Sequence, residues 1–227
     1  MPGMNMPGMN MPGMDMGKPS VGGGTNPQQQ AEAEAMHAME PGHAMDMAHM
    51  RMTPPRPANA QDRQRADQIL ASLREIIDPY KDYRVALANG YRIFMPQMPQ
   101  SEYHFTNYWN GFVESFTFDP QRPSSLLYNR THDGWELTGV MYTAPRTATL
   151  DQLNERVPLS VARWHEHINL CMPRRAQAGA NWKIFGLNGS ITTEDACREA
   201  GGRYYPQVFG WMVHIYPFAA PDKVFAH

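Results

Sequence analysis

The chain has 227 residues, a formal net charge of −2 and a pI of about 6.5. No basic patch stands out, so we expect no nucleic-acid partner. No run of about 18 apolar residues occurs, so we expect no membrane span.

Residues 1–60 are unusually poor in core-forming side chains. Val21 is their only branched aliphatic or aromatic residue, whereas thirteen of the 18 methionines fall in residues 1–52. Such a segment cannot bury enough apolar surface to offset the entropy lost on ordering, so the sequence predicts disorder over residues 1–58. Residues 59–227 carry every Trp, Tyr and Phe, and this length suits one globular domain with a sizeable core.

The predicted tail contains two groups of metal-type ligands. Residues 1–16 repeat the unit MPGMN, which gives the Met-x-Met pairs Met4 and Met6, Met9 and Met11, and Met14 and Met16. Residues 36–52 add imidazoles at His37, His43 and His49. Thioethers select Cu(I) over hard cations, and imidazole also accepts Cu(II). The alternative is a low-complexity linker with no ligand role.

The domain is predicted to open with a helical pair. Asn59 can cap a helix that begins at Ala60. Its apolar residues recur at helical spacing; they are Ala66, Ile69, Leu70, Leu73, Ile76 and Ile77. Asp78-Pro79 predicts the start of a second helix, and Gly90 predicts its end.

After residue 100 the pattern favours strands. We predict strands at 102–108, 126–131, 135–143, 161–171 and 209–218, and short helices at 150–156 and 193–200. Asp133-Gly134 between two of the strands is typical of a hairpin. The predicted fold is therefore α+β: a helical pair followed by a mostly antiparallel sheet, arranged as a partial barrel or a sandwich.

Four histidines lie in the predicted strands. His165 and His167 share a face because alternate strand residues point the same way. That predicted face consists of Arg163, His165, His167, Asn169 and Cys171. His104 and His214 come from two other strands, with Met212 on the His214 face. If these strands are neighbours, the imidazoles meet and suit Cu, Zn, Ni or non-haem Fe. Surface or hydrogen-bonded histidines are the alternative.

The two cysteines leave three readings open. Cys171 and Cys197 can form one disulfide, or remain two buried thiols. Cys171 can instead serve as a thiolate ligand beside the histidines, which excludes the bridge. No secretory signal is visible at the N-terminus. The Met-rich tail and the expected bridge nevertheless favour a periplasmic or extracellular location.

Parts of residues 83–218 resemble a group of secreted bacterial proteins with no assigned reaction. The segments are ALANGY (86–91), YHFTNY (103–108), FDPQRPSSLLYN (118–129), ELTGVMYTAP (136–145) and VHIYPF (213–218). The resemblance implies export and marks His104 and His214 as pattern positions. The segment from His165 to His167 is also similar to the first metal motif of cupins, although the later cupin glutamate is missing near Cys171.

Three functions follow from these patterns. The first is an exported metal-binding protein, with copper preferred over zinc or iron, in which the tail captures metal. The domain would hold it at His165, His167 and His214, with His104 or Met212. The second is a mononuclear His-ligated oxidoreductase, whose pocket would be lined by Tyr103, Tyr108, Tyr216, Trp164 and Trp211. The third is an interaction protein that binds no metal.

Overall fold

The computed structural model describes residues 45–174 and 179–225. All of them belong to the compact unit His37–His227. The order of their helices and strands, and the side chains that cap or bury each one, determine where the histidines lie.

The first long helix is α2 (Ala60–Ile77), as the sequence predicts. It begins there because the Asn59 side chain accepts a hydrogen bond of 2.8 Å from the Asp62 backbone N–H. The predicted second helix is divided into the 3-10 turn η1 (Asp78–Lys81) and the short α3 (Tyr83–Ala88). Among the described residues no helix is both long and apolar enough to cross a membrane.

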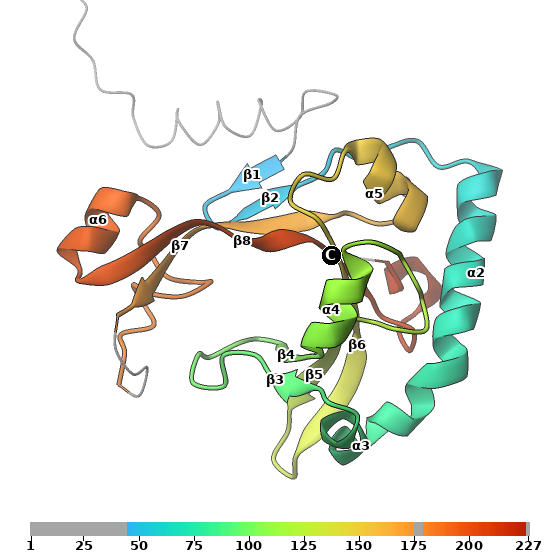
Figure 1. Ribbon diagram of the computed structural model, residues 1–227, viewed down its shortest axis with the longest axis horizontal. Coiled ribbons are helices and arrows are strands. Elements are labelled where there is room, and N and C mark those ends of the chain that lie inside the picture. The colour runs from blue at the N-terminus through green and yellow to red at the C-terminus, as the bar shows by residue number, and fades with distance from the viewer. Residues whose placement is uncertain (1–44, 175–178, 226–227) are drawn as a thin grey trace, which may run out of the picture. The chain divides into compact units, whose positions relative to one another are not determined.

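The strands form one antiparallel sheet, with the order β1-β2-β7-β8-β6-β5-β4-β3 (Figure 1). They are β1 (Met45–Met47), β2 (Met50–Met52), β3 (Arg92–Ile93), β4 (Tyr103–Thr106), β5 (Ser125–Arg130), β6 (Trp135–Ala144), β7 (His165–Pro173) and β8 (Gly202–Ile215). The α+β class and the antiparallel sheet are therefore confirmed. The described strands make a single open sheet, so they are not arranged as a sandwich.

Three shorter helices lie between the strands. The predicted helices correspond to α5 (Leu150–Arg156) and α6 (Glu194–Glu199). The third, α4 (Tyr108–Glu114), is not predicted. It begins where it does because the Asn107 side chain accepts a hydrogen bond of 3.1 Å from the Asn110 backbone N–H. This cap ends the predicted strand 102–108 at Thr106.

The hairpin of β1 and β2 lies inside the segment predicted to be disordered. β2 pairs with β7 so that Met50 is opposite His167 and Met52 is opposite His165. Met52 and Thr53 are buried. Residues 45–52 of that segment are therefore part of the sheet, because pairing with a distant strand supplies the burial that local composition lacks.

One face of the sheet packs against the apolar stripe of α2. Leu73 and Ile77 from the helix join Phe105, Tyr142 and Trp164 in the main core. Every one of these side chains is at most 1% exposed, so this face of the sheet is closed. The opposite face is the one that carries the histidines.

The sheet is strongly curved, with the histidine face concave. β8 and β4 are separated by β6 and β5, and three strand spacings in a flat sheet would amount to about 14 Å. Yet Nε2 of His104 on β4 lies 3.4 Å from Nε2 of His214 on β8. Curvature brings together side chains from strands that are not neighbours.

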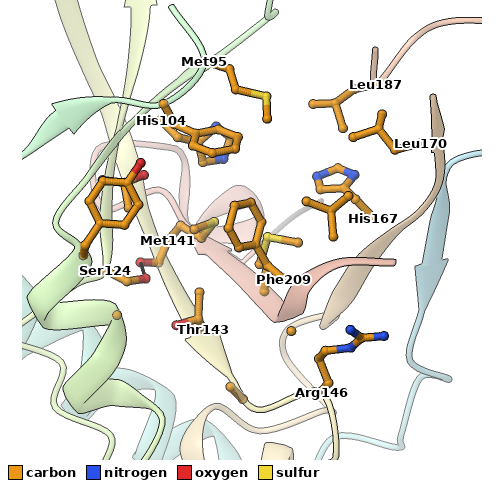
Figure 2. Close-up of a pocket in the computed structure, with 18 of the residues that line it drawn as sticks. Met95, His104, Ser124, Met141, Thr143, Arg146, His167, Leu170, Leu187 and Phe209 are labelled. Atoms are coloured by element: carbon orange, nitrogen blue, oxygen red, sulfur yellow. Dashed lines mark hydrogen bonds between the residues drawn. The ribbon is translucent and has the colours of Figure 1, made fainter. Parts of the chain in front are cut away.

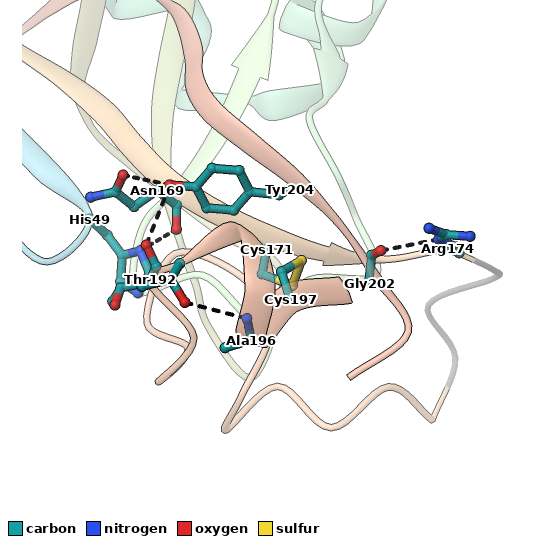
Figure 3. Close-up of a disulfide and its surroundings, with 10 residues drawn as sticks. His49, Asn169, Cys171, Arg174, Thr192, Ala196, Cys197, Gly202 and Tyr204 are labelled. Atoms are coloured by element: carbon teal, nitrogen blue, oxygen red, sulfur yellow. Dashed lines mark hydrogen bonds between the residues drawn. A yellow bond between two sulfur atoms is a disulfide. The ribbon is translucent and has the colours of Figure 1, made fainter. Parts of the chain in front are cut away.

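A disulfide links Cys171 to Cys197, with 5.6 Å between the two Cα atoms (Figure 3). The prediction of a bridge is confirmed, and the alternative of Cys171 as a thiolate ligand is wrong. Gly202 leaves room for it, since a β-carbon there would lie 2.5 Å from the Cys171 sulfur. A disulfide is typical of proteins that fold in an oxidising compartment.

The predicted histidine face of β7 ends before Asn169. This residue has a left-handed backbone, with φ of +56°, which interrupts the alternation of the strand. Its side chain accepts a hydrogen bond from the Tyr204 hydroxyl at 2.7 Å. As a result Leu170, rather than Cys171, faces the same pocket as His167, and the predicted face is wrong at its C-terminal end.

Candidate functional site

Four histidine rings lie in a row on the concave face. The centroid distances are 5.4 Å from His104 to His214, 5.0 Å from His214 to His165, and 5.4 Å from His165 to His167. The rings come from β4, β8 and β7. The structure thus brings together the four histidines that the sequence singles out.

The contact between His104 and His214 is the closest in the row. Their Nε2 atoms are 3.4 Å apart, which is long for a hydrogen bond between nitrogens. Two imidazole nitrogens bound to one tetrahedral ion, each at about 2.0–2.1 Å, would lie about 3.3–3.4 Å apart. The pair therefore has the spacing that a shared metal ion requires.

A chain of hydrogen bonds behind His214 fixes its proton. The Tyr216 hydroxyl donates to Glu102 at 3.0 Å and lies 3.2 Å from Nδ1 of His214. Because the Tyr216 hydroxyl donates its own hydrogen to Glu102, we assign the hydrogen of the bond between Tyr216 and His214 to His214 Nδ1. Thr138 donates to the other oxygen of Glu102 at 2.5 Å. Gly139 leaves room for the tyrosine ring, since a β-carbon would approach it to 2.8 Å.

His104 is held neutral by its surroundings. Burial of the ring, and then the neighbouring His167, lower the pKa of His104 to about 4. A hydrogen bond to the Glu102 backbone raises the pKa of His104 and so opposes these two effects. Since Nε2 of His104 faces His214, we assign that hydrogen bond to Nδ1. In this assignment both rings carry their hydrogen on Nδ1, so His104 and His214 present Nε2 lone pairs to each other. Such lone pairs are the ligand form of imidazole.

Two thioethers flank the row. Met212 is opposite His165 in the pairing of β7 with β8, and Met141 is opposite His214 in the pairing of β6 with β8. Residues directly opposite each other in an antiparallel pair have β-carbons about 4.5–5.5 Å apart. Met141 and Met212 are buried and contact each other in one cluster with Leu127.

The row is not a closed coordination shell. Among the described residues, no group of three or more His, Cys, Asp or Glu side chains is arranged to hold a metal ion. The centroids of the four imidazole rings lie one after another in a row and do not surround a single position where an ion could bind. A pair of rings, His104 and His214, already has the spacing of two ligands, whereas a third ring would have to rotate to reach the same ion.

A cavity of about 470 Å³ opens beside the row (Figure 2). His104 and His167 line it, and so do four of the five methionines outside residues 1–52: Met95, Met98, Met141 and Met212. Half of its other lining side chains are apolar. A small molecule in this cavity would contact the outer two imidazoles, while His165, which is 1% exposed, lies behind them.

A bulge in β8 shapes one wall of this cavity. Between the pairs His165–Met212 and His167–Val208, β7 advances by two residues and β8 by four. Phe209 in the bulge has a left-handed backbone with φ of +63°. The next residue must be glycine, because a β-carbon on Gly210 would collide with the Ala144 carbonyl oxygen. The bulge brings three consecutive residues of β8, 208–210, to the cavity wall.

Other predicted site residues lie elsewhere. His49 has its ring nitrogens 3.1 Å and 2.5 Å from the carbonyl oxygens of Asn169 and Gly189, so both are directed at backbone acceptors. The remaining predicted tail ligands lie outside the described residues; they are Met4, Met6, Met9, Met11, Met14, Met16, His37 and His43.

The aromatic pocket predicted for an enzyme is only partly present. Tyr108 lines the cavity, and Tyr216 contacts His214. The prediction that Trp164 lines the pocket is wrong, because Trp164 is fully buried in the main core. Tyr103 and Trp211 also pack against that core.

Glu114 is a buried carboxyl that is hydrogen-bonded to Thr143, a residue lining the cavity, and the pH dependence of stability tests its environment. Its Oε2 accepts hydrogen bonds from the Thr143 backbone N–H and hydroxyl at 2.8 and 2.7 Å. Burial raises the pKa of Glu114 to about 7, and the bonds from Thr143 oppose this. Because the folded pKa lies above the ordinary value of 4.5, ionising Glu114 destabilises the fold as pH rises from 4.5 through about 7.

We therefore expect Glu114→Gln to gain stability relative to wild type as pH rises across that interval. The gain should not exceed about 1.4 kcal/mol per pH unit. Urea unfolding at acidic and mildly alkaline pH measures it, and the exposed Glu155→Gln is the control. A stability difference that stays constant with pH would contradict the raised pKa.

Sequence reasoning named Tyr216 only as an aromatic residue lining a pocket, and it did not assign Glu102 or Met141 to the site. Glu102 is two residues before His104, and Tyr216 is two after His214. A spacing of two residues places Glu102 on the same strand face as His104, and Tyr216 on the same face as His214. This spacing was the sequence signal that could have assigned both residues to the site. Met141 carries no such signal, because its role depends on which strand lies beside β8.

No protein-family model, curated protein or solved structure matches the chain. The resemblances to secreted bacterial proteins and to cupins therefore stay predictions. Function must be argued from the site, since a fold class alone does not specify one.

Proposed function

We propose that this chain is an exported transition-metal-binding protein that holds copper on the concave face of its sheet. The observation that supports this is the 3.4 Å separation of the His104 and His214 Nε2 atoms, which face each other with their lone pairs in the tautomers assigned above. Two acceptors facing each other in a partly buried position are unfavourable alone. A cation between them removes that cost and gains two ligands.

The neighbouring side chains favour copper over zinc. Imidazole serves both metals, whereas thioethers are soft donors that favour Cu(I). Met141 and Met212 are opposite His214 and His165 in the sheet, so rotation of one ring and one thioether completes a mixed shell. Such a shell accepts both Cu(I) and Cu(II), which suits a protein that captures or delivers copper.

Export and the N-terminal tail belong to the same proposal. The disulfide favours an oxidising compartment. The repeated Met-x-Met pairs of residues 1–16 offer further soft donors to copper. We therefore assign capture to the tail and tighter binding to the folded domain.

Metal competition on the full chain tests the proposal. The comparison variant replaces with isoleucine the six paired methionines of the tail: Met4, Met6, Met9, Met11, Met14 and Met16. We expect wild type to bind several Cu(I) ions, and the variant to keep roughly one that excess Zn(II) does not displace. A variant that binds no copper, or a chain that prefers zinc, would overturn the assignment.

The hydroxyl of Tyr216 supplies a sharper prediction about the same centre. Tyr216→Phe removes the acceptor of His214 Nδ1–H, and loss of such an outer partner typically weakens metal binding about tenfold to a hundredfold. We expect that loss of copper affinity with an unchanged stoichiometry. Copper affinity is measured against a chromogenic Cu(I) chelator.

Tyr108→Phe is the matched control for this prediction. Tyr108 lines the same cavity, and its hydroxyl makes no hydrogen bond to any described residue. Equal copper affinities for Tyr216→Phe and wild type would show that the hydroxyl does not position a ligand.

A metalloenzyme is the second candidate, favoured by the cavity that reaches His104 and His167. A metal held there would keep a position open to a small molecule. Copper-dependent consumption of dioxygen with a reducing phenol would support this candidate. A loaded chain that shows no turnover with any such compound would count against it.

A further inference from the structure

The cavity beside the histidines has the composition of an organic-ligand site. Its volume, about 470 Å³, falls in the range of small-molecule pockets. Phe94, Met95, Leu187 and Val208 are among the apolar side chains that line it. Together they offer an apolar body of a ligand a continuous surface to bury.

The formally charged lining residues are of one sign, positive. Arg146 is the one Lys or Arg among the described lining residues, and none of them is Asp or Glu. The Arg146 Nε–H donates to Gln207 at 2.8 Å, and Gln207 in turn donates to Glu166. The guanidinium is thereby oriented, while its terminal nitrogens donate to no described residue. A planar carboxylate fits that free edge in bidentate fashion.

Arg146 lies at the rim of the cavity and is exposed to solvent. A carboxylate bound there keeps part of its hydration, so it avoids the large cost of burying a charge. Away from Arg146, by contrast, the lining contains the imidazole of His104 and the thioethers. An anionic head at the rim with an apolar chain pointing inward matches both ends.

Two aromatic rings stand at the same opening. Phe94 and Phe209 meet edge to face, with ring centroids 5.1 Å apart, and Phe209 is 49% exposed. An exposed phenyl ring on a backbone with positive φ is unfavourable in itself, and such features cluster at ligand sites. A chain passing between Arg146 and the interior would cover part of this ring.

We propose that the cavity binds an apolar monocarboxylate, with its carboxylate on Arg146 and its hydrocarbon chain directed toward His104 and His167. This inference goes beyond the proposed copper site, because the carboxylate is recognised by a guanidinium and not by a metal. It holds or fails independently of copper binding.

Titration calorimetry on the full chain, with and without a copper chelator, tests it. The probes are hexanoate, octanoate, decanoate and dodecanoate, with the corresponding primary alcohols. We expect saturable binding that strengthens with chain length until the cavity is filled, carboxylate preferred to alcohol, and no effect of the chelator. Arg146→Gln should weaken carboxylate binding about tenfold to a hundredfold while leaving the alcohol unchanged.

Gly111→Leu is a second variant, which tests the volume rather than the charge. Gly111 lines the cavity, and a β-carbon there meets its nearest neighbour, Ser124, at 3.8 Å, so the larger side chain can enter the cavity. It should abolish binding of the longer chains. Arg63→Gln, on the exposed side of α2, is the control.

Three outcomes would overturn the proposal. One is the absence of saturable binding by any carboxylate. Another is an Arg146→Gln variant that binds carboxylates as tightly as wild type. The third is binding that disappears when the chelator is added, because the carboxylate would then be a metal ligand.

Discussion

A chain in which both His104 and His214 are replaced by alanine should lose the copper of its folded domain. These residues contribute the two nitrogens already spaced for one ion. Loss of an outer-shell partner costs about tenfold to a hundredfold in metal affinity, so loss of two ligands should exceed about a hundredfold. The measurement uses the tail-methionine variant, so that copper held by residues 1–16 does not hide the change.

Thermal unfolding gives an independent readout of the same change. A ligand at a hundred times its Kd stabilises the native state by about 2.7 kcal/mol. Copper should therefore raise the Tm of the parent and not of the double variant. His132→Ala is the control, because His132 lies on an exposed turn beside Asp133 with its side chain 98% exposed. If the double variant still binds copper tightly, the ion lies elsewhere.

Removing the disulfide by Cys171→Ala with Cys197→Ala should destabilise the fold by about 3.5 kcal/mol at 25 °C. The two residues are 26 apart in sequence, and the expected loss is the entropy that closing such a loop removes from the unfolded chain. Urea unfolding of the double variant and wild type gives the difference. Reduced wild type should resemble the variant.

Measuring copper binding distinguishes a loss of fold stability from damage to the proposed copper site. Leu187, in the loop that the bridge closes, lines the cavity, whereas the four histidines lie outside residues 171–197. We therefore expect the disulfide variant, while it is folded, to bind as many copper ions per chain as wild type. A variant as stable as wild type would contradict the predicted role of the bridge.

Local signals predicted the boundaries of several elements. Asn59 for α2, Asp133-Gly134 for the β5–β6 hairpin and the segment of α5 all depend on interactions within a few residues. Elements that depend on distant partners were missed. β2 is an example, because its pairing with β7 spans more than a hundred residues, and β1 in turn pairs with β2.

In the candidate site, too, local patterns were predictable and contacts between distant strands were not. Alternation along a strand placed His165 with His167, and His214 with Met212, on common faces. It could not foresee the curvature that brings the His104 side chain on β4 to His214 on β8, nor the left-handed backbone at Asn169 that turns Cys171 away. The cavity was also beyond sequence reasoning, since the bulge that shapes it depends on β6 and β7 as well as β8.

The β1–β2 hairpin also has a bearing on solubility and on how the domain can be isolated. β2 covers the backbone of β7 from His165 to His167. A chain that starts at residue 59 would leave those N–H and C=O groups unpaired at an open edge, which is a template for adding a strand from another molecule. Such a truncated chain is expected to self-associate through β7, so a shortened protein should begin before Met45.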